Sequence, residues 1–426
     1  MLNFIDLFAG AGGLSEGFIR AGYAPLAHIE MDKYACNTLK TRTAFHWLKS
    51  QNKLSVYKKY LYEKQEREDG SKLWCQVPQE VIDTVIQSEI GEKTIEDIFK
   101  KIDALIGSKQ IDIIVGGPPC QAYSVIGRSR MGKAVKDDPR NDLYKYYVKF
   151  LERYLPKMFV FENVLGIFSA KEGELLGNLK HLVREIGYKM DYKVLTASEH
   201  GVLQKRPRVI IVGWKIKDEN YNLFHYPELE EEENPYEVLA DLFSDLPERK
   251  AGEGQLCTPI EYTKSLSEME YLKKTSIRNS IFQFTTQHIA RPINKENERK
   301  IYCMAVDMWL NEKKRIDYSK ISPDLQSHNN KESFKDRFKV VDPYGCCHTV
   351  VAHIAKDGHY YIYPTLNPSI ENIRSITIRE AARLQSFPDD YFFEGSRSAA
   401  FKQIGNAVPV VLAEKIALKI KGMYGK

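Results

Sequence analysis

One segment, residues 111–121 with the sequence IDIIVGGPPCQ, constrains this chain more than any other. Its apolar run predicts a buried strand that ends at two glycines. The two prolines that follow fix their own φ and keep the residue before each in extended geometry. Cys120 therefore lies on a stiff loop at a strand end, where a nucleophile is useful. The alternative is a core cysteine, because free cysteine is among the most buried residue types.

Three further apolar runs, at residues 2–7, 24–29 and 158–161, also end in polar or glycine-rich motifs. The first passes through a glycine-rich loop into a predicted helix at 14–20, and the last ends at the sequence ENV, residues 162–164. In open parallel α/β sheets, ligands lie at the carboxyl ends of the strands. We therefore predict an α/β fold in which all these motifs open on one crevice.

The loop after the first run is glycine-rich, but it does not match the dinucleotide fingerprint GxGxxG. That pattern needs glycine where the chain has Ser15. Glycines at 10, 12 and 13 still let the backbone approach a ligand closely at a helix N-terminus. Glu30 follows Gly10 by twenty residues, the spacing at which an acid meets a ribose hydroxyl in such units. A nucleoside without pyrophosphate fits this loop better than NAD, although a plain strand-to-helix turn gives a similar pattern.

Six motifs together resemble one family, the DNA (cytosine-5) methyltransferases, in the family's order and over nearly the whole chain. They are DLFAGAGG (6–13), GGPPCQAYS (116–124), ENV (162–164), QKRPRVIIVG (204–213), SITIREAARLQSFPD (375–389) and QIGNAVP (403–409). The compact layout is similar to bacterial and phage modification methylases. The resemblance implies a Rossmann-like S-adenosylmethionine-dependent methyltransferase sheet with helices on both faces, plus a smaller target-recognition domain.

The activity implied is transfer of a methyl group from S-adenosylmethionine to carbon 5 of a flipped-out cytosine within a specific duplex DNA sequence. The thiolate of Cys120 would add to carbon 6 and make carbon 5 nucleophilic. Glu162 would hydrogen-bond the ring nitrogen and the exocyclic amine. Arg208 is the expected base contact and Arg206 its orienting partner, because alternate residues of a strand share a face. A strand-edge salt bridge is the alternative for these arginines.

The resemblance also implies binding residues, each of which could instead be structural. The cofactor set is Asp6, Phe8, Gly10, Gly12, Gly13, Leu14, Glu30, Met31, Asp97, Ile98, Pro119, Leu143 and Asn406. The DNA-binding set is Gln121, Ser124, Arg128, Asn163 and Gln204.

The motifs divide the chain into a split catalytic domain, 1–213 and 374–426, and a target-recognition domain, 214–373. Thr377 and Glu380 form a capping box at the return to regular structure, and a final amphipathic helix follows Pro409. The charged segment 43–95 reads as a helical insertion. It could clamp DNA through four lysines or form a solvated helix pair; the lysines are Lys49, Lys53, Lys58 and Lys59.

Composition sets the remaining expectations. The net charge of +5 is compatible with DNA binding without being evidence for it. Seven cysteines without a CxxC pair indicate a reducing compartment and no metal site. With no apolar run long enough for a membrane and no secretion signal, we expect a monomer in the bacterial or phage-host cytoplasm. A separately encoded restriction endonuclease of the same specificity is a possible partner.

Three alternatives remain open on the sequence. The tRNA-methylating branch of the same superfamily keeps these motifs, so DNA is favoured over RNA mainly by the size of the recognition region. A catalytically dead DNA-binding regulator would lose the cysteine, the glutamate or the glycine loop, and all three are present. An exocyclic amino-methyltransferase would carry an aromatic residue where Cys120 stands.

Overall fold

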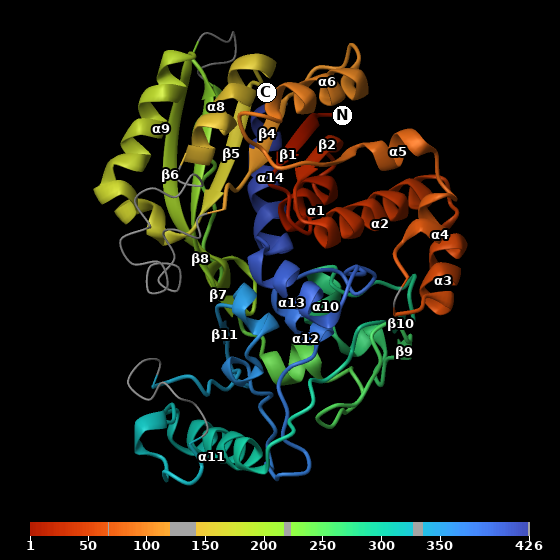
Figure 1. Cartoon of the computed structure of the whole chain (residues 1–426), viewed down its shortest axis with the longest axis vertical. Helices are drawn as coiled ribbons and strands as arrows, with labels where there is room; N and C mark the ends of the chain where they lie inside the picture. The colour runs from red at the N-terminus through yellow and green to blue at the C-terminus, as the bar shows by residue number, and fades with distance from the viewer. Residues whose placement is uncertain (67, 120–141, 217–222, 327–334, 425–426) are drawn as a thin grey trace.

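A computed structural model describes residues 1–66, 68–119, 142–216, 223–326 and 335–424. Its centre is a seven-stranded sheet with the order β3-β2-β1-β4-β5-β8-β6 (Figure 1). The strands are β1 (Asn3–Leu7), β2 (Ala24–Glu30), β3 (Val85–Gln87), β4 (Ile113–Gly116), β5 (Met158–Asn163), β6 (Tyr188–Thr196) and β8 (Pro207–Lys215). The four predicted strands correspond to β1, β2, β4 and β5, so the expected α/β fold is confirmed.

Strand β8 runs antiparallel to both of its neighbours, β5 and β6. Its start therefore lies at the same edge of the sheet as the ends of β1, β4 and β5. The register shows this, because Leu7 is beside Gly116, Gly116 is beside Phe161 and Asn163 is beside Val209. The motifs that follow the parallel strands and the motif that precedes β8 thus meet at one edge.

Helices cover both faces of the sheet, as expected. On one face pack α6 (Ile95–Ile106), α8 (Leu143–Tyr154) and α9 (Glu174–Glu185), and on the other α1 (Gly13–Arg20) and α14 (Val410–Tyr424). Helix α14 is the predicted final amphipathic helix. It buries Leu412, Ile416 and Ile420 completely against the sheet, and each such side chain contributes about 1.5–3 kcal/mol of transfer free energy.

The segment 43–95 is less separate from the sheet than the sequence indicates. It holds the second half of α2 (Lys33–Ser50), then α3 (Leu54–Glu63), α4 (Ser71–Trp74) and α5 (Gln79–Asp83), and it ends in the edge strand β3. The extra part is therefore the helices before β3. These helices are anchored by buried groups, since the Tyr57 hydroxyl donates to Asp390 O and Lys64 pairs with Glu394.

The recognition region has little regular structure. Its described strands have two residues each and are β9 (Ile260–Glu261), β10 (Phe284–Thr285) and β11 (Cys347–His348). Its described helices are α10 (Glu270–Lys274), α11 (Glu296–Glu312), the π-helix η6 (Val238–Phe243) and the 3-10 helices η7 (Leu266–Glu268), η8 (Tyr318–Lys320), η9 (Ala352–Ala355) and η10 (Gly358–Tyr360). The chain then returns through α12 (Ile378–Leu384) and α13 (Arg397–Asn406) to α14, and Thr377 and Glu380 form the predicted capping box. Strand β11 pairs in parallel with β7 (Gln204–Lys205), directly before β8.

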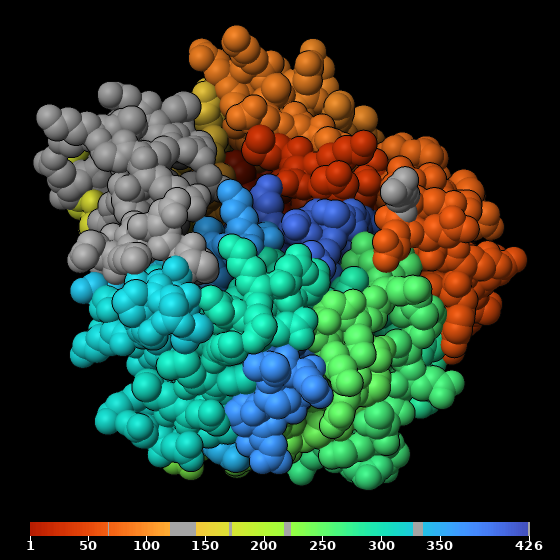
Figure 2. Space-filling view, turned by 60° about the horizontal axis from the view of Figure 1, so that its bottom comes forward, coloured from red at the N-terminus to blue at the C-terminus, as the bar shows by residue number. Residues whose placement is uncertain are grey.

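One hydrophobic cluster runs through the helical insertion, the recognition region and the C-terminal part of the chain. The ring of Phe45 in α2 lies 6.3 Å from that of Phe282, and Tyr62 lies 4.8 Å from Phe284. In Figure 2 the blue C-terminal segments lie between the red and orange N-terminal part and the green and cyan recognition region. Part of the predicted recognition domain, 214–373, therefore shares a core with the catalytic part, whereas the residues around α11 form a separate cluster.

Candidate active site

The glycine loop after β1 combines open space with very tight packing. Gly10 and Gly12 have φ of +55° and +81°, a region that favours glycine. A side chain at Gly10 would meet nothing within 4 Å, whereas the Cβ of an alanine at position 13 would lie 2.3 Å from Val408 O. The loop is thus pressed against the C-terminal segment on one side and open beside Gly10.

Glu30, at the end of β2, holds this loop with one carboxylate oxygen and the backbone after β2 with the other. Its Oε2 accepts the backbone N–H of Gly10 at 2.8 Å, and its Oε1 accepts those of Met31 and Asp32 at 2.8 Å each. Ionised carboxylates accept several hydrogen bonds, about four lone-pair sites in all. Glu30 therefore defines the shape of the open space and keeps acceptor capacity for a ligand. The Met31 side chain beside it is 58 % exposed.

Asp6 lies beneath the glycine loop and is almost completely buried. Its Oδ2 accepts a hydrogen bond from the Ser15 hydroxyl in α1. Burial raises the pKa of the Asp6 carboxyl to about 7, against the lowering effect of the Ser15 hydrogen bond. Leu14, the neighbour of Ser15, packs in the core on this face of the sheet.

Glu162 and Arg208 form an ion pair at the centre of the strand-end edge. The Nε of Arg208 lies 2.8 Å from Oε1 of Glu162, and these side chains are only 10 % and 13 % exposed. The other carboxylate oxygen faces Gly117, where an added Cβ would lie 2.7 Å away. A glycine at position 117, three residues before Cys120, therefore leaves room for the Glu162 carboxylate where it lies.

The next residue, Asn163, supports the same loop from inside. Its Nδ2 donates to Pro118 O at 3.4 Å, its Oδ1 accepts the Val164 N–H, and its side chain is buried. The loop continues through the half-buried Pro119. Cys120, Gln121, Ser124 and Arg128 lie outside the described residues.

The family model for C-5 cytosine-specific DNA methylases matches residues 2–63 and 76–422. The chain belongs to this family. It is 39 % identical to the type II methyltransferase M.Bpa9945I of Bacillus paralicheniformis, over 98 % of each chain. It is 31 % identical to M.DdeI of Desulfomicrobium norvegicum, over 99 % of this chain and 89 % of that protein. The chain is therefore a DNA cytosine-5 methyltransferase, and DNA is favoured over the tRNA alternative.

Two solved structures share the fold. An Escherichia coli chain described as a prophage-encoded DNA modification methyltransferase superposes with a TM-score of 0.62 at 22 % identity, covering 100 % of both chains. The Schizosaccharomyces pombe Dnmt2 methyltransferase gives 0.51 at 15 % identity, also over 100 % of both. The part of the insertion that the family model leaves unmatched, residues 64–75, includes helix α4.

Two residues predicted to contact DNA are placed inside this methyltransferase instead. Gln204 is fully buried, its amide donates to Leu384 O and Gln385, and its carbonyl accepts the Val350 N–H. Asn163 is buried against the loop, as described above. Both residues have a supporting role in this structure, because the amide nitrogen and the amide oxygen of each side chain form hydrogen bonds within the protein.

Arg206, predicted to orient Glu162, does not contact it. Its guanidinium is fully buried and donates to the carbonyls of Val350, Gly405 and Ala407. Gln204, Arg206 and Arg208 are all buried while Lys205 is exposed, so the predicted alternation holds, but the Arg206 guanidinium donates to these carbonyls and not to Glu162. Within the described parts of the chain, Arg208 is the cation that forms an ion pair with the carboxylate.

The positions of Asp97 and Ile98 do not support the predicted adenine contact. Asp97 is 72 % exposed and pairs with Lys100 on the first turn of α6, and Ile98 is buried in the core. The residues that follow β3 directly are Ser88, Glu89 and Ile90. The helices before β3 lengthen the segment between the previous motif and this one, so the position of the adenine contact could not be read from the sequence.

The remaining cofactor candidates lie at element ends around the edge. Phe8 has a φ of +58° and packs partly on the core, and Leu143 begins α8. Asn406 is exposed at the end of α13, two residues before Val408. Tyr391 was not predicted, although its hydroxyl donates to Ala11 O in the glycine loop. Tyr391 lies 380 positions after Ala11, and no motif in the sequence connects the two residues.

The described parts of the chain contain no group of three or more His, Cys, Asp or Glu side chains placed to hold a metal ion. In the same parts, no helix is both long enough and apolar enough to span a membrane.

Proposed function

We propose that this methyltransferase moves a methyl group from S-adenosylmethionine to carbon 5 of a cytosine that is flipped out of duplex DNA, with Cys120 as the nucleophile. The observation that supports this most directly is the Glu162–Arg208 ion pair packed against Gly117. It places a partly exposed carboxylate beside the loop that leads to the only cysteine in the six motifs.

The chemistry requires activation of the pyrimidine ring, because carbon 5 of cytosine is a weak nucleophile. The Cys120 thiolate forms a bond to carbon 6, and the electron pair of the ring double bond becomes available at carbon 5. Glu162 accepts a hydrogen bond from the exocyclic amine and shares a proton with the ring nitrogen, which offsets the charge that the ring gains. After methylation, a base removes the carbon 5 proton, and the carbon–sulfur bond breaks to restore the double bond and the thiolate.

The residues at the strand ends fit the proposed cofactor, which supplies an electrophilic methyl group on a sulfonium. Beside Gly10 is open space, and Glu30 presents a carboxylate at its border. The Phe8 ring and the exposed Met31 side chain suit the faces of an adenine. A site of this kind takes a nucleoside without a pyrophosphate.

DNA recognition falls to the region 214–373 in this proposal. The target carbon lies inside a stacked duplex, so the base must be extruded before it can reach Glu162. Type II methyltransferases stand among the relatives, and we place this enzyme in a restriction-modification system with a partner endonuclease of the same specificity.

The test is expression in a host that lacks cytosine methylation, beside Cys120→Ala, with 5-methylcytosine mapped across the genome at base resolution. We expect a short motif to be methylated by the parent and unmethylated with the variant. An unmethylated genome in cells that contain folded, cofactor-binding parent enzyme would refute the proposal. Methylation that persists with Cys120→Ala would refute the role of the cysteine.

A further inference from the structure

Arg206 is the side chain through which three distant segments meet. Its Nη1 donates to Val350 O, at the point where the recognition region returns to the sheet. Its Nη2 donates to Gly405 O at 3.1 Å and to Ala407 O at 2.8 Å. These are the carbonyls of the two residues that flank Asn406, so one nitrogen holds the backbone before and after this residue.

Gln204 binds the same residue of the recognition region, Val350, at its backbone N–H. Its Oε1 accepts the Val350 N–H at 2.8 Å, while Arg206 donates to the Val350 carbonyl. The residue between them contributes as well, because Thr349 donates its hydroxyl to Lys205 O at 2.7 Å. The peptide groups of Val350 are therefore both bound by side chains from the short strand before Arg208.

The turn at Asn406 in turn supports the glycine loop. An alanine Cβ at position 13 would lie 2.3 Å from Val408 O and 3.1 Å from the Cβ of Ala407. Gln385 braces this turn by donating to Ile404 O at 2.8 Å. A continuous path of contacts thus leads from Val350 through Arg206 and Ala407 to Gly13.

A fully buried guanidinium is expensive to retain for stability alone, because burial of a charge carries a large desolvation penalty. Burial and the neighbouring Arg208 lower the pKa of the Arg206 guanidinium. Its Nε has no hydrogen-bond partner among the described residues. The role of Arg206 is therefore to connect the backbone at Val350 with the backbone at Gly405 and Ala407.

We propose that Arg206 is a positioning residue that sets the turn at Asn406, and through it the glycine loop, relative to the returning segment of the recognition region at Val350. The seating of the recognition region is thereby coupled to the shape of the cofactor site. This inference rests on the proposed use of S-adenosylmethionine.

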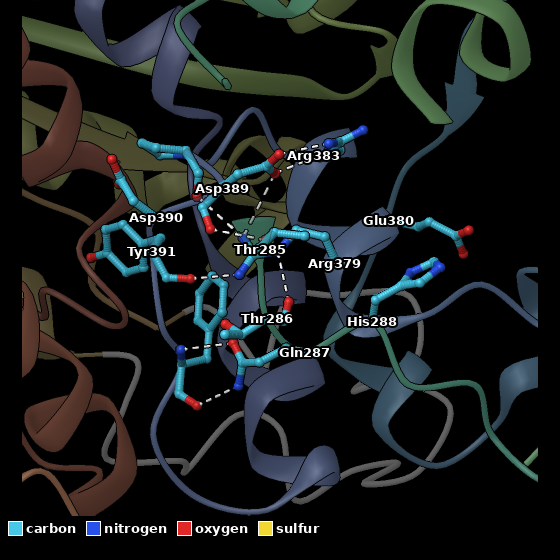
Figure 3. Close-up of polar contacts among 12 residues, drawn as sticks. Thr285, Thr286, Gln287, His288, Arg379, Glu380, Arg383, Asp389, Asp390 and Tyr391 are labelled. Atoms are coloured by element: carbon cyan, nitrogen blue, oxygen red, sulfur yellow. Dashed lines mark hydrogen bonds and ion pairs between the residues drawn. The ribbon is translucent and has the colours of Figure 1, made fainter. Parts of the chain in front are cut away.

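The chain offers a matched control in Arg379, which Figure 3 shows between the recognition segment and the turn after α12. Arg379 is also fully buried, and it also donates to three carbonyls, those of Thr286, Pro388 and Tyr391. Arg206→Lys and Arg379→Lys both shorten a buried donor that serves three carbonyls. The two changes act on the glycine loop at different points. Arg206 holds the turn that packs against Gly13, whereas Arg379 holds the backbone of Tyr391, whose hydroxyl donates to Ala11 O.

The measurement is the dissociation constant of S-adenosylhomocysteine by calorimetry, with amide hydrogen exchange of the peptides around Val350 and Asn406. We expect Arg206→Lys to raise the dissociation constant at least tenfold and to speed exchange in both peptides together. Arg379→Lys should raise the constant less than Arg206→Lys and leave exchange around Val350 as in the parent, because its path through Tyr391 does not include Val350. If Arg206→Lys does not fold, Gln204→Met tests the same path, since it removes the acceptor of the Val350 N–H.

Equal affinities in the Arg206→Lys and Arg379→Lys variants would overturn the inference and leave Arg206 with a purely structural role. Unchanged affinity with a lower methylation rate would also overturn it, because Arg206 would then act on the base. A parent enzyme that binds no S-adenosylhomocysteine would refute the proposed cofactor, a result distinct from either of these.

Discussion

The Nε of Arg208 lies 2.8 Å from Oε1 of Glu162, and the two residues come from neighbouring antiparallel strands, β8 and β5. The strands run in opposite directions, so the start of one and the end of the other bring the two side chains to the same edge. Because the pair is about nine-tenths buried, its electrostatic attraction is screened less than that of a surface pair. The carboxylate that is proposed to meet the cytosine thus has one fixed cation.

Replacing Arg208 by alanine should lower the methylation rate about 100- to 1000-fold, the range found when one preorganised donor is removed from an active site. Glu162 would lose the cation that orients it. The affinity for S-adenosylhomocysteine should stay within about threefold of the parent, because Arg208 does not contact the glycine loop in the described contacts. Single-turnover rates and calorimetry check both expectations. A rate close to that of the parent would show that the ion pair is not part of the catalytic machinery.

Replacing Glu30 by glutamine should weaken cofactor binding. The carboxylate accepts three backbone N–H groups, and an amide would turn an NH₂ group toward at least one of them. A hydrogen bond to a charged group contributes about 1.5–3 kcal/mol, so we expect the dissociation constant of S-adenosylhomocysteine to rise at least tenfold. Asp97→Asn is the control, since the exposed position of Asp97 on α6 predicts a change below twofold. A comparable effect in both variants would contradict this assignment of the site.

The buried carboxyl of Asp6 should make stability depend on pH. Its pKa in the folded protein is raised from 3.8 to about 7, mainly by burial. Between these values the folded state binds more protons than the unfolded state, so the free energy of unfolding falls as pH rises. We expect Asp6→Asn to gain stability over the parent, by about 2–3 kcal/mol more at pH 8 than at pH 5. Urea unfolding at both pH values measures this difference.

The control for this experiment is Glu63→Gln, because the Glu63 side chain is 63 % exposed. Its stability relative to the parent should be nearly the same at the two pH values. A gap between Asp6→Asn and the parent that is constant from pH 5 to pH 8 would show that Asp6 does not titrate in this range.

The parts of the fold that the sequence predicted are those that depend on residues close together in the sequence. Apolar runs that stop at glycine or acidic residues identified β1, β2, β4 and β5, and the capping box identified the start of α12. The edge strand β3 was missed because it is three residues long and follows a charged helical segment. The antiparallel direction of β8 was also missed, since direction depends on the connection between strands rather than on their own residues.

The site shows the same division. From motifs next to strands, the sequence predicted that Glu30, Glu162 and Arg208 belong to the site, but it gave the orienting role to Arg206, whereas Arg208 forms the ion pair with Glu162. It could not predict the partners of Arg206, because the three carbonyls that it binds lie 144 to 201 residues away. It placed Gln204 on the DNA for the same reason, since its partners Val350 and Leu384 come from other parts of the chain.

Asp245 should be essential for holding the recognition region on the catalytic part. Its buried carboxylate pairs with Arg278 and with Arg383 of α12. Asp245→Ala would leave both arginines without this partner, and loss of one member of a buried ion pair costs about 3–5 kcal/mol. Urea unfolding followed by circular dichroism and tryptophan fluorescence measures the loss, with Lys59→Ala in an exposed pair as a control that changes little.

Because one hydrophobic cluster spans the insertion, the recognition region and the C-terminal part, this loss should appear as an earlier midpoint of a single transition. Tryptophan fluorescence, to which Trp47 and Trp74 beside this cluster and Trp309 of α11 contribute, and the circular dichroism of the helices should change together. Two separate transitions in Asp245→Ala would mean that the recognition region unfolds by itself. Its core would then be independent of α12, against the continuous packing between Phe243, Phe282 and Leu384.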